Sequence, residues 1–280
     1  MGKFSKILAK TGLYSGKSSQ EDMAGGVELE SMARTNQLSR EEWDERFLAV
    51  SSVSWQAAES FRILRSRIVY PADDAKELRT IMITSSSPSE GKSFISANLG
   101  LSIAKGLDQH ALVVDCDLRR PTLAKLFGLQ ERAKLGLANY LAEPDCELAK
   151  LLQKTSVPKL SILPSGVPPT NPAELLASVR MSSLVRELAS RYADRYIIFD
   201  SPPFQVASET IVLAQAVDAV VLVVGYGKSD RHLIRNLVES IGREKIIGVV
   251  FNGMKSNLLQ QKVLDGYGYA GGYYGSRREK

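Results

Sequence analysis

A lysine and a serine that follow an apolar run are the first residues here with an evident chemistry. The segment TSSSPSEGKSFISANL (84–99) leads from that run into a helix-forming stretch. Ser86 stands where the phosphate-loop pattern GxxxxGK[ST] has its first glycine, so the match is partial. Backbone N–H groups at such a helix start can still surround phosphates, Lys92 can reach the β- and γ-phosphate oxygens, and Ser93 can bind Mg²⁺. A plain strand-to-helix turn is the alternative, but the context favours an ATP and Mg²⁺ site made of Ser86, Ser87, Pro88, Ser89, Glu90, Gly91, Lys92, Ser93 and Phe94.

Three aspartates also follow apolar runs. Asp115 and Asp117 end the run VVDCD two residues apart, so both point to one side as the strand ends, and Asp200 ends the run YIIFD. One such aspartate alone is more often a turn or cap residue. Three beside one phosphate loop can hold Mg²⁺ and orient a nucleophile. We therefore predict metal ligation by Ser93, Asp117 and Asp200, and catalytic roles for Lys92, Asp115 and Asp117.

These residues need parallel strands to bring them together. Short runs rich in Val, Ile and Leu have the continuous apolar character of strands buried on both faces; they are residues 79–84, 111–117, 160–165, 196–203, 218–225 and 246–252. Helix-forming stretches lie at 54–69, 93–106, 172–192, 207–216 and 229–243. Strands that alternate with helices predict an α/β protein with a doubly wound, mainly parallel sheet.

The two ends of the chain differ from this regular part. Residues 1–50 lack a sustained period, and residues 21–45 carry eight acidic side chains against two arginines, so we expect this segment to be largely disordered. Residues 51–263 form the predicted nucleotide-binding domain, and the glycine-rich residues 264–280 form a flexible tail. The net charge of +5 is spread with mixed signs, which does not indicate nucleic acid binding but suits a protein near an anionic membrane. Two cysteines and no apolar run of membrane-spanning length favour a reduced, cytoplasmic setting.

The segments SSPSEGKS, LVVDCDLRRP and YIIFDSPP resemble the Walker A, A′ and B motifs of the bacterial tyrosine kinases (BY-kinases), which are autokinases of capsule and exopolysaccharide synthesis. The resemblance covers residues 50–280 and implies a P-loop NTPase fold with deviant Walker motifs. Related ATPases that position septa and segregate chromosomes usually carry an additional lysine early in Walker A. Residues 85–89 contain no lysine, which favours the kinase branch.

Three further segments resemble features of that family, and each has a plainer alternative. Glu59, Arg62 and Arg65 match an ExxRxxR motif that mediates ring assembly there, although three charges at helical spacing can be a solvated ion-pair ladder. GVPPTNPAELLAS (166–178) resembles a family segment, although Asn171 and the residues after it also suit a helix start. Asn252 resembles a position that contacts the adenine base, and a turn asparagine is an equal alternative.

The tail supplies the expected phosphoacceptors, which are Tyr267, Tyr269, Tyr273 and Tyr274. The resemblance implies an ATP-dependent protein-tyrosine kinase that phosphorylates this cluster in trans within a homo-oligomeric ring. It also implies a membrane polysaccharide co-polymerase as activating partner, and hence a cytoplasmic protein held at the inner face of the cell membrane through that partner. The first alternative is a nucleotide-switched positioning ATPase without kinase activity. The second is an assembly protein with a vestigial kinase site.

Overall fold

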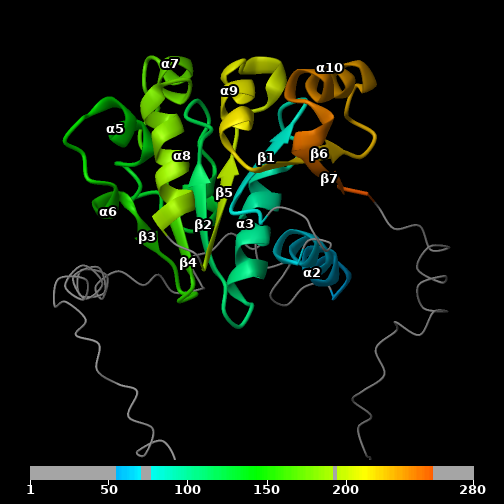
Figure 1. Ribbon diagram of the computed structural model, residues 1–280, viewed down its shortest axis with the longest axis horizontal. Helices are drawn as coiled ribbons and strands as arrows, with labels where there is room; N and C mark the ends of the chain where they lie inside the picture. The colour runs from blue at the N-terminus through cyan, green and yellow to red at the C-terminus, as the bar shows by residue number, and fades with distance from the viewer. Residues whose placement is uncertain (1–54, 71–76, 192–193, 255–280) are drawn as a thin grey trace, which may run out of the picture. The chain divides into compact units, whose positions relative to one another are not determined.

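The computed structural model describes residues 55–70, 77–191 and 194–254 (Figure 1). The predicted N-terminal segment 1–50, the domain boundary at 263 and the tail 264–280 lie outside these residues. In the described ranges, none of the helices combines the length and the apolar character that crossing a bilayer would require.

A seven-stranded sheet forms the centre of the fold, in the order β3-β4-β2-β5-β1-β6-β7. All neighbouring strands are parallel except β3 and β4, which are antiparallel. The strand bounds are β1 Thr80–Ser85, β2 His110–Asp115, β3 Gln153–Lys154, β4 Leu160–Leu163, β5 Arg195–Asp200, β6 Ala219–Gly225 and β7 Ile246–Asn252. The predicted doubly wound, mainly parallel sheet is confirmed.

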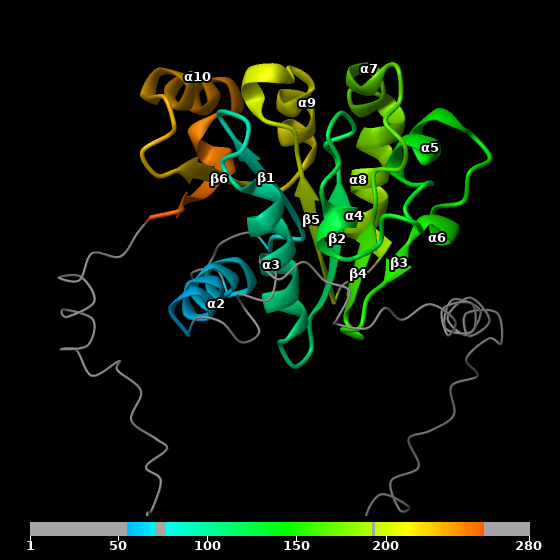
Figure 2. The same ribbon diagram turned by 180° about the vertical axis from the view of Figure 1, so that it is seen from behind.

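Helices cover both faces of this sheet (Figures 1 and 2). Alternate residues of the central strands enter two separate apolar clusters, so that in β1 Ile81 and Ile83 pack on one face and Met82 on the other. The first face is covered by α2 (Trp55–Val69), α3 (Lys92–Ala104) and α4 (Leu123–Leu126). The second is covered by α5 (Leu137–Ala142), α6 (Leu148–Leu151), α7 (Pro172–Leu176), α8 (Val179–Arg191), α9 (Glu209–Ala216) and α10 (Arg231–Ile241). Short 3-10 turns, η5 (Phe204–Val206) and η6 (Arg243–Lys245), precede α9 and β7.

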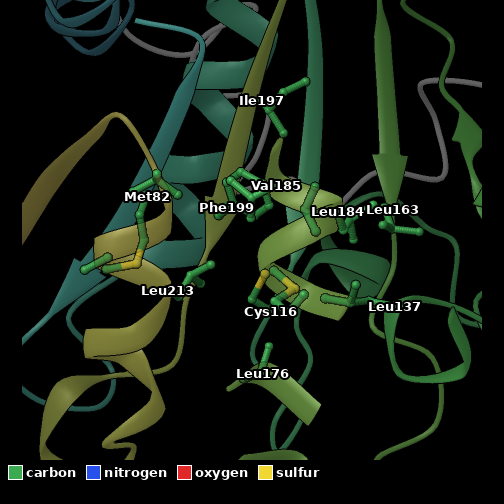
Figure 3. Packing of buried hydrophobic residues seen from close by; sticks show 14 of the residues in the cluster. Met82, Cys116, Leu137, Leu163, Leu176, Leu184, Val185, Ile197, Phe199 and Leu213 are labelled. Carbon is green, nitrogen blue, oxygen red and sulfur yellow. The ribbon is translucent and has the colours of Figure 1, made fainter. Parts of the chain in front are cut away.

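The second cluster includes Cys116, which packs among Leu137, Leu176 and Leu184 (Figure 3). Its thiol is free and buried, and burial raises its pKa well above the usual value. This is the environment of a small apolar core residue.

On the other face of the sheet, a side chain at Gly100 would approach Val113 Cγ2 to 2.5 Å, so glycine lets α3 lie close to β2. Helix α3 begins at Lys92, and its close packing fixes that lysine relative to the strand ends.

Two predicted elements were wrong in detail. The single helix expected at 172–192 is divided into α7 and α8, because Ser178 accepts a hydrogen bond from the Met181 N–H at 3.1 Å and so caps a new helix. Asn171 directly precedes α7 and Pro172 begins it, but the Asn171 side chain makes no capping hydrogen bond.

The last predicted strand was expected to be buried on both faces. Strand β7 is instead an edge strand, at the opposite end of the sheet from β3, and its residues alternate between half-buried and exposed. Ile247, Val249 and Phe251 therefore show apolar side chains to solvent within the described part of the chain.

Candidate nucleotide and catalytic site

The loop between β1 and α3 has the backbone shape of a phosphate-binding loop. Ser89 is the one residue other than glycine with a positive φ in the described ranges, at 61°, and Gly91 has a φ of 96°. A Cβ at Gly91 would lie 1.9 Å from Asn252 Nδ2, so both the backbone angle and the neighbouring side chain require glycine there. The Gly91 carbonyl accepts from the Ile95 N–H at 3.0 Å, which opens α3. The loop N–H groups and the helix N-terminus thus lie together, as anion binding requires.

A cavity of about 1010 Å³ lies against this loop. Lys92, with its side chain largely buried, is part of the wall, as is the half-buried Asp117. The complete lining is Pro88, Ser89, Gly91, Lys92, Ser93, Phe94, Asp117, Arg119, Arg120, Thr122, Lys125, Leu126, Pro203, Val206 and Asn252. Ser86, Ser87, Glu90, Asp115 and Asp200, which the sequence also assigned to the site, are not part of this lining. Burial lowers the pKa of Lys92, and the carboxylates of Asp200, Asp117 and Glu90 oppose that change.

The strands β2 and β5 end side by side, and Asp115 is paired in register with Asp200. Both carboxylates are fully buried. Burial raises the pKa of Asp200 to about 6, and the Ser93 hydroxyl, the Lys92 ammonium and the Ser96 hydroxyl limit the rise. Ser96 Oγ donates to Asp200 Oδ1 at 3.1 Å, while Asp200 Oδ2 has no hydrogen-bond partner. One buried oxygen of Asp200 is therefore left with unused bonding capacity.

Asp115 is bonded differently. Its Oδ1 accepts from the Asp117 N–H at 3.2 Å, and its Oδ2 accepts from the N–H groups of Thr122 and Leu123 at 3.2 and 3.0 Å. Burial, together with the charge of Asp200, raises its pKa well above the usual value. Asp115 thus holds the loop between β2 and α4, and its geometry does not support the direct catalytic role expected from the sequence.

Asp117 is the carboxylate of this loop that faces the cavity. Its Oδ1 accepts from the Arg120 N–H at 3.0 Å, which fixes the side chain. Burial raises its pKa, and the Arg120 N–H, Lys92 and Arg119 work against this rise. A carboxylate held in this way can accept a hydrogen bond or a proton from a group bound in the cavity.

The donor set fits a magnesium ion. Mg²⁺ prefers oxygen ligands, keeps several waters and usually takes one or two carboxylates together with nucleotide phosphates. Ser93 and Asp117 line the cavity, and the Ser93 hydroxyl also interacts with Asp200, whose Oδ2 has no hydrogen-bond partner. Within the described ranges, no three His, Cys, Asp or Glu side chains are grouped tightly enough to form an all-protein metal site. The arrangement suits a metal that arrives with a nucleotide.

Asn252 was expected near the adenine base. It lines the cavity, but its side-chain amide is already hydrogen-bonded within the protein. Its Nδ2 donates to the Glu90 carbonyl at 2.8 Å, so Asn252 connects the end of β7 to the phosphate loop. This contact gives Asn252 a structural role at the end of β7, and its contact with the adenine base stays a prediction.

Sequence reasoning missed several polar residues of the site. Thr122 Oγ1 donates to Ser93 Oγ at 2.6 Å and so joins the loop after β2 to the start of α3. Arg119, which lines the cavity, donates from Nη2 and Nε to Glu209 Oε1 at 2.7 and 3.2 Å. Thr122 follows the LRRP segment closely enough to be noticed, but Glu209 lies 90 residues from Arg119 and nothing in the sequence connects the two.

The candidate interface helix α2 divides its charged residues between two roles. Arg62 Nη1 pairs with Glu59 at 2.8 Å on the exposed surface. Arg65 Nη1 instead donates to the Ser102 carbonyl of α3 at 2.8 Å. The ExxRxxR residues are thus partly internal, and the ring contact stays a prediction. The tyrosine cluster at 267–274 lies outside the described residues.

Comparisons with known proteins match the chain to a nucleotide-binding family and to tyrosine kinases. Residues 81–269 match the family described as the CobQ/CobB/MinD/ParA nucleotide binding domain. The chain is 32% identical over 216 residues to the tyrosine-protein kinase YwqD of Bacillus subtilis, covering 76% of this chain and 86% of that protein. It is also 32% identical over 214 residues to the tyrosine-protein kinase ptk of Acinetobacter johnsonii, covering 76% of this chain but 28% of the longer protein. The kinase domain of the Escherichia coli tyrosine kinase ETK superposes with a TM-score of 0.67 at 28% identity, over 82% of this chain and 89% of that domain.

Proposed function

Because the chain belongs to the bacterial tyrosine kinase family, we propose that it uses Mg·ATP to phosphorylate tyrosines of its own C-terminal segment, in exopolysaccharide or capsule synthesis. The observation that carries this proposal is that Lys92, Ser93 and Asp117 line one cavity, and that Lys92 and Ser93 also interact with Asp200. The side chains come from the ends of three different elements. A parallel sheet brings such ends to one edge, where α/β enzymes bind nucleotides.

In the proposed reaction, loop N–H groups and Lys92 bind the β- and γ-phosphates and stabilise the charge that develops during transfer. Ser93 and Asp200 would hold the magnesium ion, directly or through water, and the bound ion would neutralise phosphate charge. Asp117 accepts the phenol proton as the tyrosine oxygen attacks the γ-phosphorus, the bond from that phosphorus to the β–γ bridging oxygen breaks, and ADP leaves. The fixed position of Asp117, through the Arg120 N–H, supports this assignment over Asp115.

The acceptors we propose are Tyr267, Tyr269, Tyr273 and Tyr274 of an adjacent subunit in a ring. We further propose that the cytoplasmic end of a membrane co-polymerase activates the enzyme and holds it at the inner face of the membrane. The solvent-facing Glu59–Arg62 pair on α2 supports an assembly contact there, because it is not used inside the described part of the chain.

The experiment is a phosphotyrosine assay of the purified chain with Mg·ATP and the partner's cytoplasmic segment. We expect phosphate on the tail of the parent protein and none in Lys92→Met, which keeps the loop backbone but loses the countercharge. Substitution of the four tail tyrosines by phenylalanine should also abolish the signal. Steady ATP hydrolysis without any phosphotyrosine would instead favour the positioning ATPase. Normal phosphotyrosine in Lys92→Met would overturn the assignment of the site.

A further inference from the structure

Glu90 is an acidic residue in the middle of a loop built to bind anions, and its side chain does not face the cavity. The residues on either side of it, Ser89 and Gly91, both line the cavity, whereas Glu90 does not. Its side chain is 2% exposed. A buried carboxylate needs hydrogen-bond donors, because leaving it without partners is costly. The donors around Glu90 therefore show what the residue does.

Those donors come from the loop itself and from a distant segment. The Ser87 N–H donates to Oε2 at 3.2 Å, and the Ser86 hydroxyl lies 3.4 Å from each carboxylate oxygen. Ser229, in the connection between β6 and α10, donates its hydroxyl to Oε1. The bond from Ser87 closes the turn that contains the positive φ of Ser89. A residue other than glycine in that conformation persists only where its surroundings hold it.

The main chain of Glu90 is held as well, since its carbonyl accepts from Asn252 Nδ2 at 2.8 Å. Gly225, at the end of β6, also lies close to Glu90, because a Cβ added at Gly225 would lie 3.4 Å from Glu90 Cγ. The ends of β6 and β7 thus both contact the centre of the phosphate loop. The contact from β7 is to the backbone and the contact from the β6–α10 connection is to the side chain.

We propose that Glu90 and Ser229 form a buried clasp, a pair of positioning residues that holds the phosphate loop in its nucleotide-binding shape and so sets the affinity for ATP. The clasp rests on the proposed function in one respect, because ATP is taken as the ligand. It adds a residue outside the three Walker-like segments to the control of that site. Neither residue touches the nucleotide; both act through the loop backbone.

The bonding pattern distinguishes the clasp from a simple charge effect. All three partners of the Glu90 carboxylate are donors, which suits a group that only accepts. Glutamine can preserve the pattern, because its oxygen accepts from the Ser87 N–H while its amide donates to the Ser229 oxygen. The Ser229 hydroxyl would then turn to the Gly225 carbonyl, which is already 3.2 Å away. Glu90→Gln therefore removes the charge and keeps the clasp, whereas Glu90→Ala removes both.

The test is a titration of the full-length chain with a fluorescent ATP analogue and Mg²⁺, which requires no phosphoryl transfer. We expect Ser229→Ala to weaken binding about fivefold and Glu90→Ala about tenfold or more, the range for losing one or more hydrogen bonds. Glu90→Gln should bind within about twofold of the parent protein. The double variant with alanine at both positions should bind no more weakly than Glu90→Ala, because both changes break the same contact.

Ser240→Ala is the matched control, because Ser240 lies on α10 and donates to the Asn236 carbonyl at 2.7 Å without contacting the phosphate loop. If Ser229→Ala and the control bind equally well, the clasp is refuted. If Glu90→Gln binds as weakly as Glu90→Ala, charge rather than bonding sets the affinity, and the clasp is also refuted. Circular dichroism checks folding, and Ser229→Ala and Glu90→Gln still test the clasp if Glu90→Ala does not fold.

The transfer assay gives a second, separable readout. A positioning pair should raise the KM for ATP and leave kcat at saturating ATP within about twofold, whereas a catalytic residue would lower kcat. The expected binding pattern in a chain that shows no tyrosine phosphorylation would overturn the proposed function and leave the clasp standing. Phosphorylation of the tail together with equal ATP affinity in all variants would refute the clasp and leave the proposed function standing.

Discussion

The ends of β2 and β5 carry the same chemical group at paired positions, and the two groups have opposite bonding. Asp115 and Asp200 are aligned in register and are both fully buried. Three backbone N–H groups take up both oxygens of Asp115, whereas Asp200 keeps an oxygen without a partner. The two carboxylates are thus equally buried and differ in the number of hydrogen-bond donors around them. We propose that this difference separates a carboxylate with a structural role from one that serves the metal.

The largest expected effect comes from Asp200→Asn. We expect phosphoryl transfer to fall roughly 100-fold, as for residues that support a metal site, because a neutral amide is a poor partner for Mg²⁺. The fold should be at least as stable as that of the parent, since no native hydrogen bond depends on the free oxygen. Transfer rates and a urea melt of the same sample measure both. If Asp200→Asn transfers phosphate at nearly the parent rate but is clearly less stable, Asp200 has the structural role that we assign to Asp115.

The pH dependence of stability in EDTA should come next in size. The pKa of Asp200 rises to about 6 on folding, from a usual value near 3.8, so the folded protein binds this proton more tightly than the unfolded chain. That contribution is complete below about pH 3.8 and is lost as the pH rises through about 6. The parent should therefore lose up to about 3 kcal/mol relative to Asp200→Asn between pH 4 and 7. A constant difference between the two unfolding free energies across this range would contradict the assignment.

Asp115→Asn tests the other side of the comparison. The amide can replace one acceptor but places its NH₂ group against backbone N–H donors, so we expect the free energy of unfolding to fall by about 2 kcal/mol. The loss of transfer should be smaller than for Asp200→Asn once the protein is folded at low temperature. Denaturant titration at pH 7 gives the stability. An unchanged unfolding free energy together with complete loss of transfer would return Asp115 to a direct catalytic role.

Helix α2 shows a similar contrast, with a smaller expected effect, between a side chain bonded inside the protein and one paired on its surface. Arg65→Ala removes an internal bond to the Ser102 carbonyl and should cost about 1 kcal/mol of stability. Arg62→Ala breaks only an exposed pair with Glu59 and should leave the stability nearly unchanged. Arg62→Ala is therefore the clean probe of the proposed ring contact. Light scattering should show a smaller particle for this variant, and an unchanged mass would leave α2 without an assembly role.

The fold could be predicted because its strands are continuous apolar runs. Parallel strands covered on both faces leave a strong local signal, and β1, β2, β5 and β6 were found within one to three residues. The elements that were missed, β3 and the short helices α4, α5 and α6, have too few residues to establish a period. The division at Ser178 was missed because one hydroxyl, and not a change of periodicity, ends one helix and starts the next.

The site was predicted as a set of residues but not as a set of contacts. Lys92, Ser93 and Asp117 follow from strand-end motifs, because the sheet brings those ends together whatever the details of the loops. The difference between Asp115 and Asp200 depends on where the backbone of residues 117–123 turns, and spacing alone does not specify it. The partnership of Glu90 with Ser229 joins positions 139 residues apart. Such contacts leave no trace in a local pattern.

The packing of α2 on α3 gives the chain a route for thermodynamic linkage. The rings of Phe61 and Phe94 meet edge to face with centroids 6.0 Å apart, and Phe94 also lines the nucleotide cavity. Ser102 donates to the Phe61 carbonyl, so the two helices are joined along their length. If a neighbouring subunit binds α2 more tightly when ATP orders Phe94, then assembly must tighten ATP binding by the same factor. Measuring the affinity for ATP at a series of protein concentrations would give that factor. An affinity that does not change with protein concentration would show that assembly and ATP binding are not coupled.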